Sequence, residues 1–436
     1  MNRSGFLGLC GCALLAAALP ALDFNEDDYG SLSDFLDEIY GVDENAGLTA
    51  FPVLNIPMGG RSEGMAGAFS AVADDASFLE WNPAGSSLLS VTELAFFHNN
   101  WISDTKVEGL VFASRYKNVG FAGGGKWLYT PFTEYNIYGE RVAKGYYSEA
   151  VAVLNASYNF FSGYYFSGLS VGVNLKGAFR FTPDFTNDSE EVSAGSSAGS
   201  SAGASAGSGK EQSAAMAMAD LGLLTRFDFL KFYYARERNV SAALVVRNLG
   251  PPALDDPLPT AAAAALSYRP LRPILLSFEF CLPVNLADPA ASEAPYWAAG
   301  LSVTVARFLS MRAGLMAKTG NARIAVGSAV TLDRIALEVN YTLDLLTQFT
   351  PLNRISLGVR FNLGDQGRKA LADEVERLYL RGLDAYSNDQ DDEAQTYWEE
   401  AARLDPSFEP AFEGLALLRH IHEVENRINA LNSLDF

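Results

Sequence analysis

Cysteine, histidine, basic side chains and long apolar runs are all scarce in this chain of 436 residues. Two of its three cysteines, Cys10 and Cys12, lie in an N-terminal apolar run. Removal of that run would leave only Cys281, so no internal disulfide is expected. Beyond the same run, no stretch reaches the roughly 18 consecutive apolar residues of a transmembrane helix. The 52 acidic residues outnumber the 32 basic ones, which argues against nucleic acid as a partner.

The shortage of histidine bears on catalysis and metal binding. Only His98, His420 and His422 are present, which is little material for a hydrolase site. His420 and His422 stand two residues apart on a predicted helix, so they point to different faces and make a poor metal pair. The sequence therefore predicts no enzyme, no metal site and no cofactor.

The N-terminus has the composition of a secretory signal peptide. Arg3 precedes an apolar run over residues 6–19, and the small residues Ala18 and Ala21 offer cleavage sites. We therefore expect residues 1–21 to be a signal peptide that exports the chain. A lipoprotein is the alternative, because residues 9–12 (LCGC) resemble a lipobox.

Most of the chain alternates apolar with polar residues, which is the pattern of β-strands. Residues 334–344 show it most clearly, and residues 169–181 and 354–363 repeat it. A soluble sandwich with one buried face would alternate in the same way. An exported chain without a transmembrane helix, however, can span a bilayer only as a closed barrel. About fourteen such segments favour an all-β transmembrane barrel of antiparallel strands.

The links between these strands alternate in length. Links after even-numbered strands are mostly tight, such as residues 117–118, 161–163 and 270–271, and would be periplasmic turns. Links after odd-numbered strands are mostly longer, such as residues 130–146 and 182–213, and would be extracellular loops. The strands are expected at residues 91–102, 106–117, 118–129, 147–160, 164–181, 214–229, 239–249, 260–269, 272–284, 295–306, 308–318, 321–332, 333–344 and 353–364.

A low-complexity tract of serine, alanine and glycine fills residues 193–209 of the third long loop. It has no side chains with which to build a core, so it is expected to be a surface excursion. It serves either as a tolerated spacer or as a surface epitope whose repeat number would vary between isolates.

The segment ahead of the first strand is rich in small residues. Residues 59–85 read GGRSEGMAGAFSAVADDASFLEWNPAG, in which the glycines permit close backbone packing. Met65, Phe69, Phe78 and Trp81 supply large apolar anchors. We expect this segment to lie inside the barrel as a plug or hatch.

Three motifs of this segment, R-S-x-G-M-x-G-A-F, A-D-D-A and W-N-P-A-G, resemble the N-terminal region of the FadL-like outer-membrane family. That family includes long-chain fatty acid transporters and the PorV-type barrels of secretion systems. The resemblance implies a fourteen-stranded barrel closed by a hatch, through which hydrophobic molecules pass from outside, often leaving sideways through a gap in the wall. The resemblance is close over the hatch. Over the barrel it extends only to the number of strands and the alternation of short and long links.

The resemblance also implies which hatch residues bind or gate. The family's N-P-A motif falls on Asn82, Pro83 and Ala84. Asn82 would hydrogen-bond the hatch backbone to the barrel wall, and Pro83 would stiffen the exit into the first strand. Arg61 is expected to contact a neighbouring aspartate or a luminal carboxylate, because buried charges need partners. The alternative is that these residues hold the hatch without touching a ligand. The candidate binding and gating residues are Arg61, Met65, Phe69, Asp74, Asp75, Trp81, Asn82, Pro83 and Ala84.

The acidic segment before the hatch bears on the identity of the ligand. Residues 23–44 hold nine acidic and no basic side chains. If this segment faces the ligand path, it repels free fatty carboxylates.

After residue 364 the apolar period changes from 2 to 3.6, which predicts a separate helical domain. The last strand, at residues 356–363, resembles the signal that the barrel-assembly machinery reads. Residues 375–406 resemble one tetratricopeptide repeat (TPR), which a third helix over residues 408–431 would cap. Such repeats usually need three or more units to be stable, so this one must pack against the barrel, a second copy or a partner. It either docks a periplasmic protein or is a helical hairpin that plugs or steadies the periplasmic mouth. The candidate docking residues are Leu378, Gly382, Tyr386, Ala394, Trp398, Ala401 and Pro406.

These observations divide the chain into four parts. They are a signal peptide (1–21), an acidic segment with a luminal hatch (22–90), an outer-membrane β-barrel (91–364) and a periplasmic TPR-like domain (365–436). The working hypothesis is a channel for hydrophobic molecules, namely long-chain fatty acids or other lipids, surrounded by outer-membrane lipid. The alternatives are a PorV-like anchor for exported proteins and a surface antigen selected for its loops.

Overall fold

The computed structural model describes residues 43–102, 104–135, 138–181, 213–253, 256–319, 321–346 and 352–432. The expected signal peptide and the serine-rich tract lie outside these residues, as does most of the acidic segment. The described residues fall into two compact units, one within Met1–Tyr158 and Ser170–Leu363, the other within Asn159–Leu169 and Gly364–Phe436. Among the described helices, none combines the length and the apolar character of a membrane-crossing helix.

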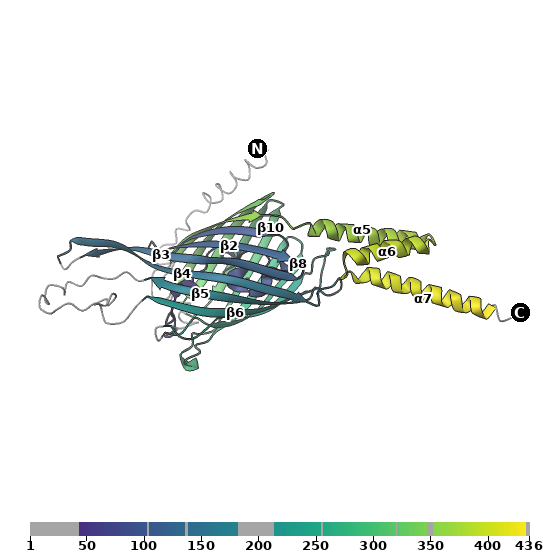
Figure 1. The fold of residues 1–436 in the computed structure, drawn as a ribbon. Coiled ribbons are helices and arrows are strands. Elements are labelled where there is room, and N and C mark those ends of the chain that lie inside the picture. The colour runs from purple at the N-terminus through teal and green to yellow at the C-terminus, as the bar shows by residue number, and fades with distance from the viewer. Residues whose placement is uncertain are drawn as a thin grey trace, which may run out of the picture. The chain divides into compact units, whose positions relative to one another are not determined.

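The first unit is a closed antiparallel barrel of fourteen strands, which confirms the predicted fold (Figure 1). Each strand pairs with its neighbours in sequence, and β1 closes the barrel against β14, with Glu93 opposite Asn362 and Asn99 opposite Ser356. The strands are β1 (Glu93–Asn100), β2 (Lys106–Tyr116), β3 (Val119–Tyr135), β4 (Arg141–Phe160), β5 (Leu169–Phe181), β6 (Ala214–Phe227), β7 (Val240–Leu249), β8 (Ala261–Leu271), β9 (Ile274–Pro283), β10 (Tyr296–Ala306), β11 (Leu309–Ala317), β12 (Asn321–Leu332), β13 (Ile335–Leu346) and β14 (Leu352–Asn362).

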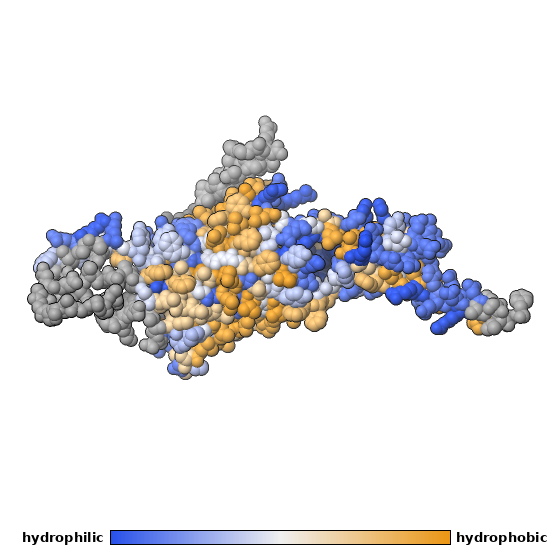
Figure 2. All heavy atoms as spheres, viewed as in Figure 1, coloured by the Kyte–Doolittle hydropathy of each residue, from blue (hydrophilic) through white to orange (hydrophobic). Residues whose placement is uncertain are grey.

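The strands turn large apolar side chains outward, and their inward positions include many polar and charged side chains. In β5, Leu175 and Phe179 are exposed, whereas Ser170, Asn174 and Lys176 are buried in the lumen. Figure 2 shows the resulting apolar surface over the barrel strands. A soluble sandwich would bury its apolar faces between two sheets, so this alternative is wrong.

Three predicted boundaries are wrong in the region of β3 to β5, namely the end of β3, the start of β4 and the start of β5. Residues 130–135 and 141–146, expected in a loop, continue β3 and β4 as a paired ribbon beyond the predicted strand ends (Figure 1). Residues 164–168, expected in the fifth strand, are instead part of a turn in which the Gly163 N–H donates to the Phe166 carbonyl at 2.8 Å. Their aromatic residues look like strand residues, but Tyr164 packs against Phe408 within the second unit, with ring centroids 5.1 Å apart.

The links define two ends of the barrel. Those after β2, β8, β10 and β12 are tight, whereas most of those after odd-numbered strands are longer. We call the end at which the odd-numbered strands are linked onward the long-loop end. It includes η4 (Pro289–Ala291) between β9 and β10.

The segment before β1 fills the lumen as the sequence predicted, and we call residues 58–89 the hatch (Figure 1). It holds α3 (Arg61–Gly64), α4 (Phe78–Trp81) and η2 (Pro83–Leu88), and η1 (Pro52–Leu54) precedes it. Most of its side chains are buried. Helix α3 contacts β11, β12 and β13, while η2 contacts β2, β3 and β6, so the hatch reaches opposite sides of the wall.

The helices of the second unit are α5 (Arg368–Ser387), α6 (Asp391–Leu404) and α7 (Glu409–Asn432). Trp398 is the largest side chain of their shared core. The indole N–H of Trp398 donates to the Tyr379 carbonyl at 3.2 Å. In the same unit, the Tyr165 hydroxyl donates to Glu413 at 2.8 Å, and this hydrogen bond raises the pKa of Tyr165 to about 12.

Candidate functional site

A cavity of about 860 Å³ lies in the lumen between the hatch, residues 43–57 and the inner wall. Its wall residues include Trp101, Tyr296 and Lys318, which stand at the strand ends that face the long-loop end. The volume falls within the range of pockets that hold a small organic ligand. The cavity therefore lies on the side of the hatch that faces the long-loop end.

Much of the cavity lining is apolar. The hatch contributes a floor through Met58, Leu79 and Trp81, and residues 43–57 contribute Leu54 and Ile56. The wall adds Trp101, Val151, Val153, Ala298 and Met316. Such a lining favours a ligand with a large apolar body.

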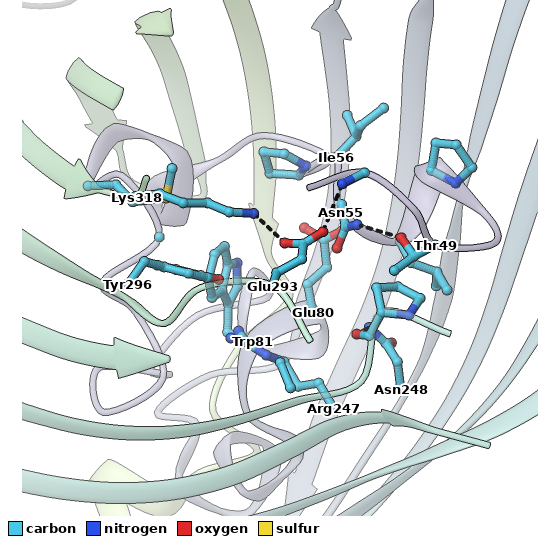
Figure 3. A pocket seen from close by; sticks show the side chains of 18 of the residues that line it. Thr49, Asn55, Ile56, Glu80, Trp81, Arg247, Asn248, Glu293, Tyr296 and Lys318 are labelled. Atoms are coloured by element: carbon cyan, nitrogen blue, oxygen red, sulfur yellow. Dashed lines mark hydrogen bonds and ion pairs between the residues drawn. The ribbon is translucent and has the colours of Figure 1, made fainter. Parts of the chain in front are cut away.

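The cations that line the cavity are all paired with carboxylates. Figure 3 shows Lys318 of the wall reaching Glu293, with Tyr296 of β10 and Trp81 of the hatch also lining the cavity. The nitrogen-to-oxygen distances are 2.5 Å for Lys318 to Glu293, 2.5 Å for Lys126 to Glu80, 2.7 Å for Lys176 to Asp220, 3.3 Å for Arg247 to Glu279 and 2.6 Å for Arg323 to Asp344. An anionic ligand would therefore compete with a carboxylate already in place.

Asp43 and Glu44, the described part of the acidic segment, also line the cavity. They carry no basic partner among the ion pairs of the described chain. Two more carboxylates on the lining make it less favourable for an anion.

The structure brings together the charged hatch residues that the sequence singled out. Arg61 lies 2.6 Å from Asp74 and 3.6 Å from Asp75, as expected from the need of buried charges for partners. Asp75 is also 3.4 Å from Arg360 of β14, so this cluster joins the hatch to the wall. None of these four residues lines the cavity.

The N-P-A motif fastens the hatch. The Asn82 amide donates to the Ser70 carbonyl at 2.8 Å and to the Leu223 carbonyl of β6 at 3.3 Å, while its oxygen accepts from the Ala84 N–H at 3.0 Å. Pro83 opens η2 and packs close to Gly222 of β6. These three residues are buried and lie outside the cavity lining, so their contacts position the hatch.

The remaining hatch candidates are apolar. Met65 and Phe69 are fully buried, and Met65 lies against Gly300 and Gly314 of the wall. Trp81 is the one candidate of the nine that lines the cavity. Arg247 lies over its ring, 5.0 Å from the centroid.

The wall residues that hydrogen-bond the backbone of the hatch and of the segment just ahead of it were not predicted from the sequence. Glu149 accepts from the Val53 N–H at 2.9 Å, just ahead of the hatch, and Glu93 accepts from the Ala76 N–H at 2.7 Å. Two side-chain amides of the wall donate to backbone carbonyls instead. Asn99 donates to the Pro57 carbonyl and Asn340 to the Gly60 carbonyl, both at 2.9 Å. The signal was present in the sequence, because each of these side chains occupies an inward position of an alternating strand.

The wall is thin where β3 carries three consecutive glycines. Gly125 and Lys126 line both the cavity and a groove on the outer surface, which Phe96, Leu110 and Trp127 also line. The pairing of β3 with β2 and β4 continues through Gly123–Gly125 without a register shift, so the wall is closed here. Only backbone separates the two spaces at Gly125.

The candidate docking residues of the helical unit form its interior. Leu378, Gly382, Ala394, Trp398 and Ala401 are buried, Tyr386 packs against them, and Pro406 is exposed in the turn after α6. Their role in docking a partner stays a prediction. Within the described ranges, no group of three or more His, Cys, Asp or Glu side chains is placed to hold a metal ion.

Solved structures resemble this fold at low sequence identity. A structure described as the CymD monoaromatic hydrocarbon channel has 13% identity and a TM-score of 0.47, covering 71% of this chain and 97% of that one. The P. putida toluene transporter TodX has 11% identity and a TM-score of 0.41, covering 70% of this chain and 98% of that one.

Relatives from Treponema pallidum (strain Nichols) match most of the sequence. One, described as a UPF0164 protein, is 29% identical over 401 residues, which is 87% of this chain and 85% of the relative. Another of the same description is 26% identical over 410 residues, or 87% of this chain and 77% of the relative. The family model described as Uncharacterised protein family (UPF0164) matches residues 41–366, so the chain belongs to that family.

Proposed function

We propose that this protein is an outer-membrane channel that takes up hydrophobic molecules through the luminal cavity. The observation that carries the proposal is a cavity of about 860 Å³ with a largely apolar lining, set between a fixed hatch and the wall of a closed barrel. A closed barrel with an apolar outer face is the β-structure that a bilayer accommodates.

The orientation of the barrel follows from its loops. In outer-membrane barrels the longer links are extracellular and the tight turns periplasmic. With that orientation the cavity faces the outside, where a nutrient would enter, and the C-terminal helices follow β14 into the periplasm.

The ligand we propose has a long apolar body and a small polar head. Long-chain fatty acids are the ligands that the sequence resemblance implies, and the apolar floor suits their chains. The paired cations and the nearby Asp43 and Glu44 favour an uncharged head over a carboxylate. A fatty alcohol should therefore bind at least as tightly as the fatty acid of equal chain length at neutral pH.

The exit we propose is sideways through β3 rather than down through the hatch. The hatch is hydrogen-bonded to wall residues on β1, β4, β9 and β13, among others. Displacing it would break many buried hydrogen bonds, each costly to leave unmade. Parting β3 from one neighbour near Gly125 breaks only local ladder bonds and opens the cavity directly to the outer groove.

The test is uptake of a fluorescent fatty acid and a fluorescent fatty alcohol into vesicles that contain the refolded barrel. Ala298→Phe places a ring in the cavity, whereas Ala299→Phe places the same ring on the outer face of the same strand. We expect A298F to abolish uptake and A299F to retain it. Equal uptake by both variants, once each is shown to be folded, would contradict transport through the cavity.

A second candidate function is a PorV-like anchor that holds exported proteins at the outer membrane. The fixed hatch favours it, because a filled lumen suits an anchor better than a pore. This function requires stable co-purification of a secretion component with the wild-type chain and predicts unchanged co-purification in A298F.

A further inference from the structure

The second half of helix α7 carries apolar side chains that the described part of the chain leaves uncovered. Ala411 and Leu418, in its first half, are buried in the core of the helical unit. In contrast, Val424, Ile428 and Leu431 are 40%, 50% and 64% exposed. Figure 1 shows this end of α7 running past the ends of α5 and α6. The first half of the helix therefore packs within the unit, while an apolar stripe begins at the exposed Leu417 and continues through the second half.

The partly or fully exposed apolar side chains along this face are Leu417, Ile421, Val424, Ile428 and Leu431. They have the spacing of a coiled-coil seam. These residues follow one another at intervals of four, three, four and three, which is the heptad pattern of alternating d and a positions. Isoleucine occupies both a positions, and leucine occupies two of the three d positions. We define the α7 stripe as Leu417 (d), Ile421 (a), Val424 (d), Ile428 (a) and Leu431 (d).

We propose that the α7 stripe is the seam of a parallel, two-stranded coiled coil between two copies of this chain. β-Branched residues at a combined with leucine at d favour two strands over three or four. The flanking polar residues fit the same arrangement, because His420 at g would face Glu425 at e of the second copy, where an imidazole N–H can donate to the carboxylate. No like-charged pair arises between the g and e positions of the stripe in this register.

Membrane topology places the helices of two copies on the same side. The helices follow β14 in every copy, so two barrels inserted the same way in one membrane send their helices to the same side. The helical units of both copies therefore lie in the same compartment, where the two α7 stripes can meet. Two heptads are short for association in dilute solution, but confinement to one membrane raises the effective concentration, and α7 is already folded by its first half.

The first test is disulfide formation in the full-length chain, refolded into lipid vesicles without its native cysteines. Val424→Cys places a thiol at the seam, and Asn426→Cys places one at the outer f position of the same turn. We expect mild oxidation to convert most of the V424C chain to a covalent dimer and to leave N426C largely monomeric. Equal cross-linking of the two variants, or none in V424C, would overturn the proposal.

The second test counts copies by single-molecule photobleaching in vesicles. Ile421→Asp with Ile428→Asp charges the seam, while Asn426→Asp with Asn429→Asp adds the same charge to the outer face. We expect two copies for the wild type and for the asparagine variant, and one copy for the isoleucine variant. Single copies of the wild type, three or more copies, or dimers that survive I421D/I428D would each reject the coiled coil. All these side chains are at least partly exposed, so the substitutions leave the helical core intact.

Discussion

The Glu279 carboxylate on β9 accepts the backbone N–H of Ser70 at 3.0 Å, although 209 residues separate the two in sequence. The same oxygen accepts the N–H of Phe69, and the other oxygen faces Arg247. One inward-facing side chain thus satisfies two hatch N–H groups and one wall cation. The hatch has little regular structure of its own, so contacts of this kind fix its position in the lumen.

Replacing Glu279 with alanine should loosen the hatch. The change leaves Arg247 without its counter-ion and two buried N–H groups without an acceptor, a loss of about 3–5 kcal/mol for a buried ion pair. We expect a lower urea midpoint for the barrel in lipid vesicles and larger ion conductance in planar bilayers. Glu237→Ala is the control, because Glu237 is exposed and its pair with Arg269 is at the surface. Wild-type conductance in E279A would show that other contacts suffice to hold the hatch.

The glycine run of β3 supplies a second prediction. A Cβ at position 125 would lie 2.1 Å from the Val151 carbonyl of β4, whereas a Cβ at position 123 finds its nearest neighbour at 3.7 Å. Gly125→Ala should therefore push β3 and β4 apart, at a cost of roughly 1–3 kcal/mol. Gly123→Ala, two residues away on the same face, should leave stability near that of the wild type. The measurement is the urea midpoint of both variants, and equal midpoints would contradict the close packing.

The same pair of variants tests the sideways exit. If ligand leaves at Gly125, G125A should change the rate at which a fluorescent ligand passes from the barrel into the surrounding lipid, and G123A should not. Identical rates for G125A and wild type would place the exit elsewhere.

The ion pair on the cavity wall predicts how ligand preference can be changed. Glu293 pairs with Lys318 and also accepts the Gly47 N–H at 3.0 Å, a bond that glutamine can keep. Glu293→Gln should therefore free Lys318 for a fatty carboxylate without disturbing the loop. We expect fatty acid to gain about 1 kcal/mol, or roughly fivefold in affinity, relative to the fatty alcohol of equal length. Binding is measured by displacement of a fluorescent probe, and an unchanged ratio of the two affinities would show that Lys318 does not meet the head group.

The barrel was predictable because its signal is local. Alternation in 169–181 and 334–344 places each side chain inward or outward without reference to any other strand. The ribbon at residues 130–135 and 141–146 escaped prediction because it extends beyond the alternating segments and its pairing depends on the partner strand.

The hatch could be recognised from the sequence as a unit, but the wall residues that hydrogen-bond it could not. Arg61 and Asp74 are 13 residues apart and could be matched by charge. The partners of the hatch backbone, such as Glu279 and Asn340, lie 200 or more residues away, and an inward polar residue gives no sign of which N–H or carbonyl it meets. The cavity likewise depends on how far the hatch fills the lumen, which no local pattern encodes.

The helical unit yields a prediction in which packing opposes intrinsic propensity. In a solvated helix, Gly382→Ala would stabilise by about 1 kcal/mol, because glycine is a poor helix former. Here a Cβ at position 382 would lie 2.3 Å from the Trp398 indole nitrogen, which must stay in place to reach the Tyr379 carbonyl. Overpacking should outweigh propensity and destabilise the unit by roughly 1–2 kcal/mol. Protease cleavage between α5 and α6 in the full-length protein should then be roughly tenfold faster. This factor applies when the unit opens and closes faster than the protease cuts, because cleavage then follows the population of the open unit. Arg381→Ala, at the exposed neighbouring position, should leave the rate unchanged. Slower cleavage of G382A would mean that Trp398 can move aside, and that glycine is not required for the contact between the two helices.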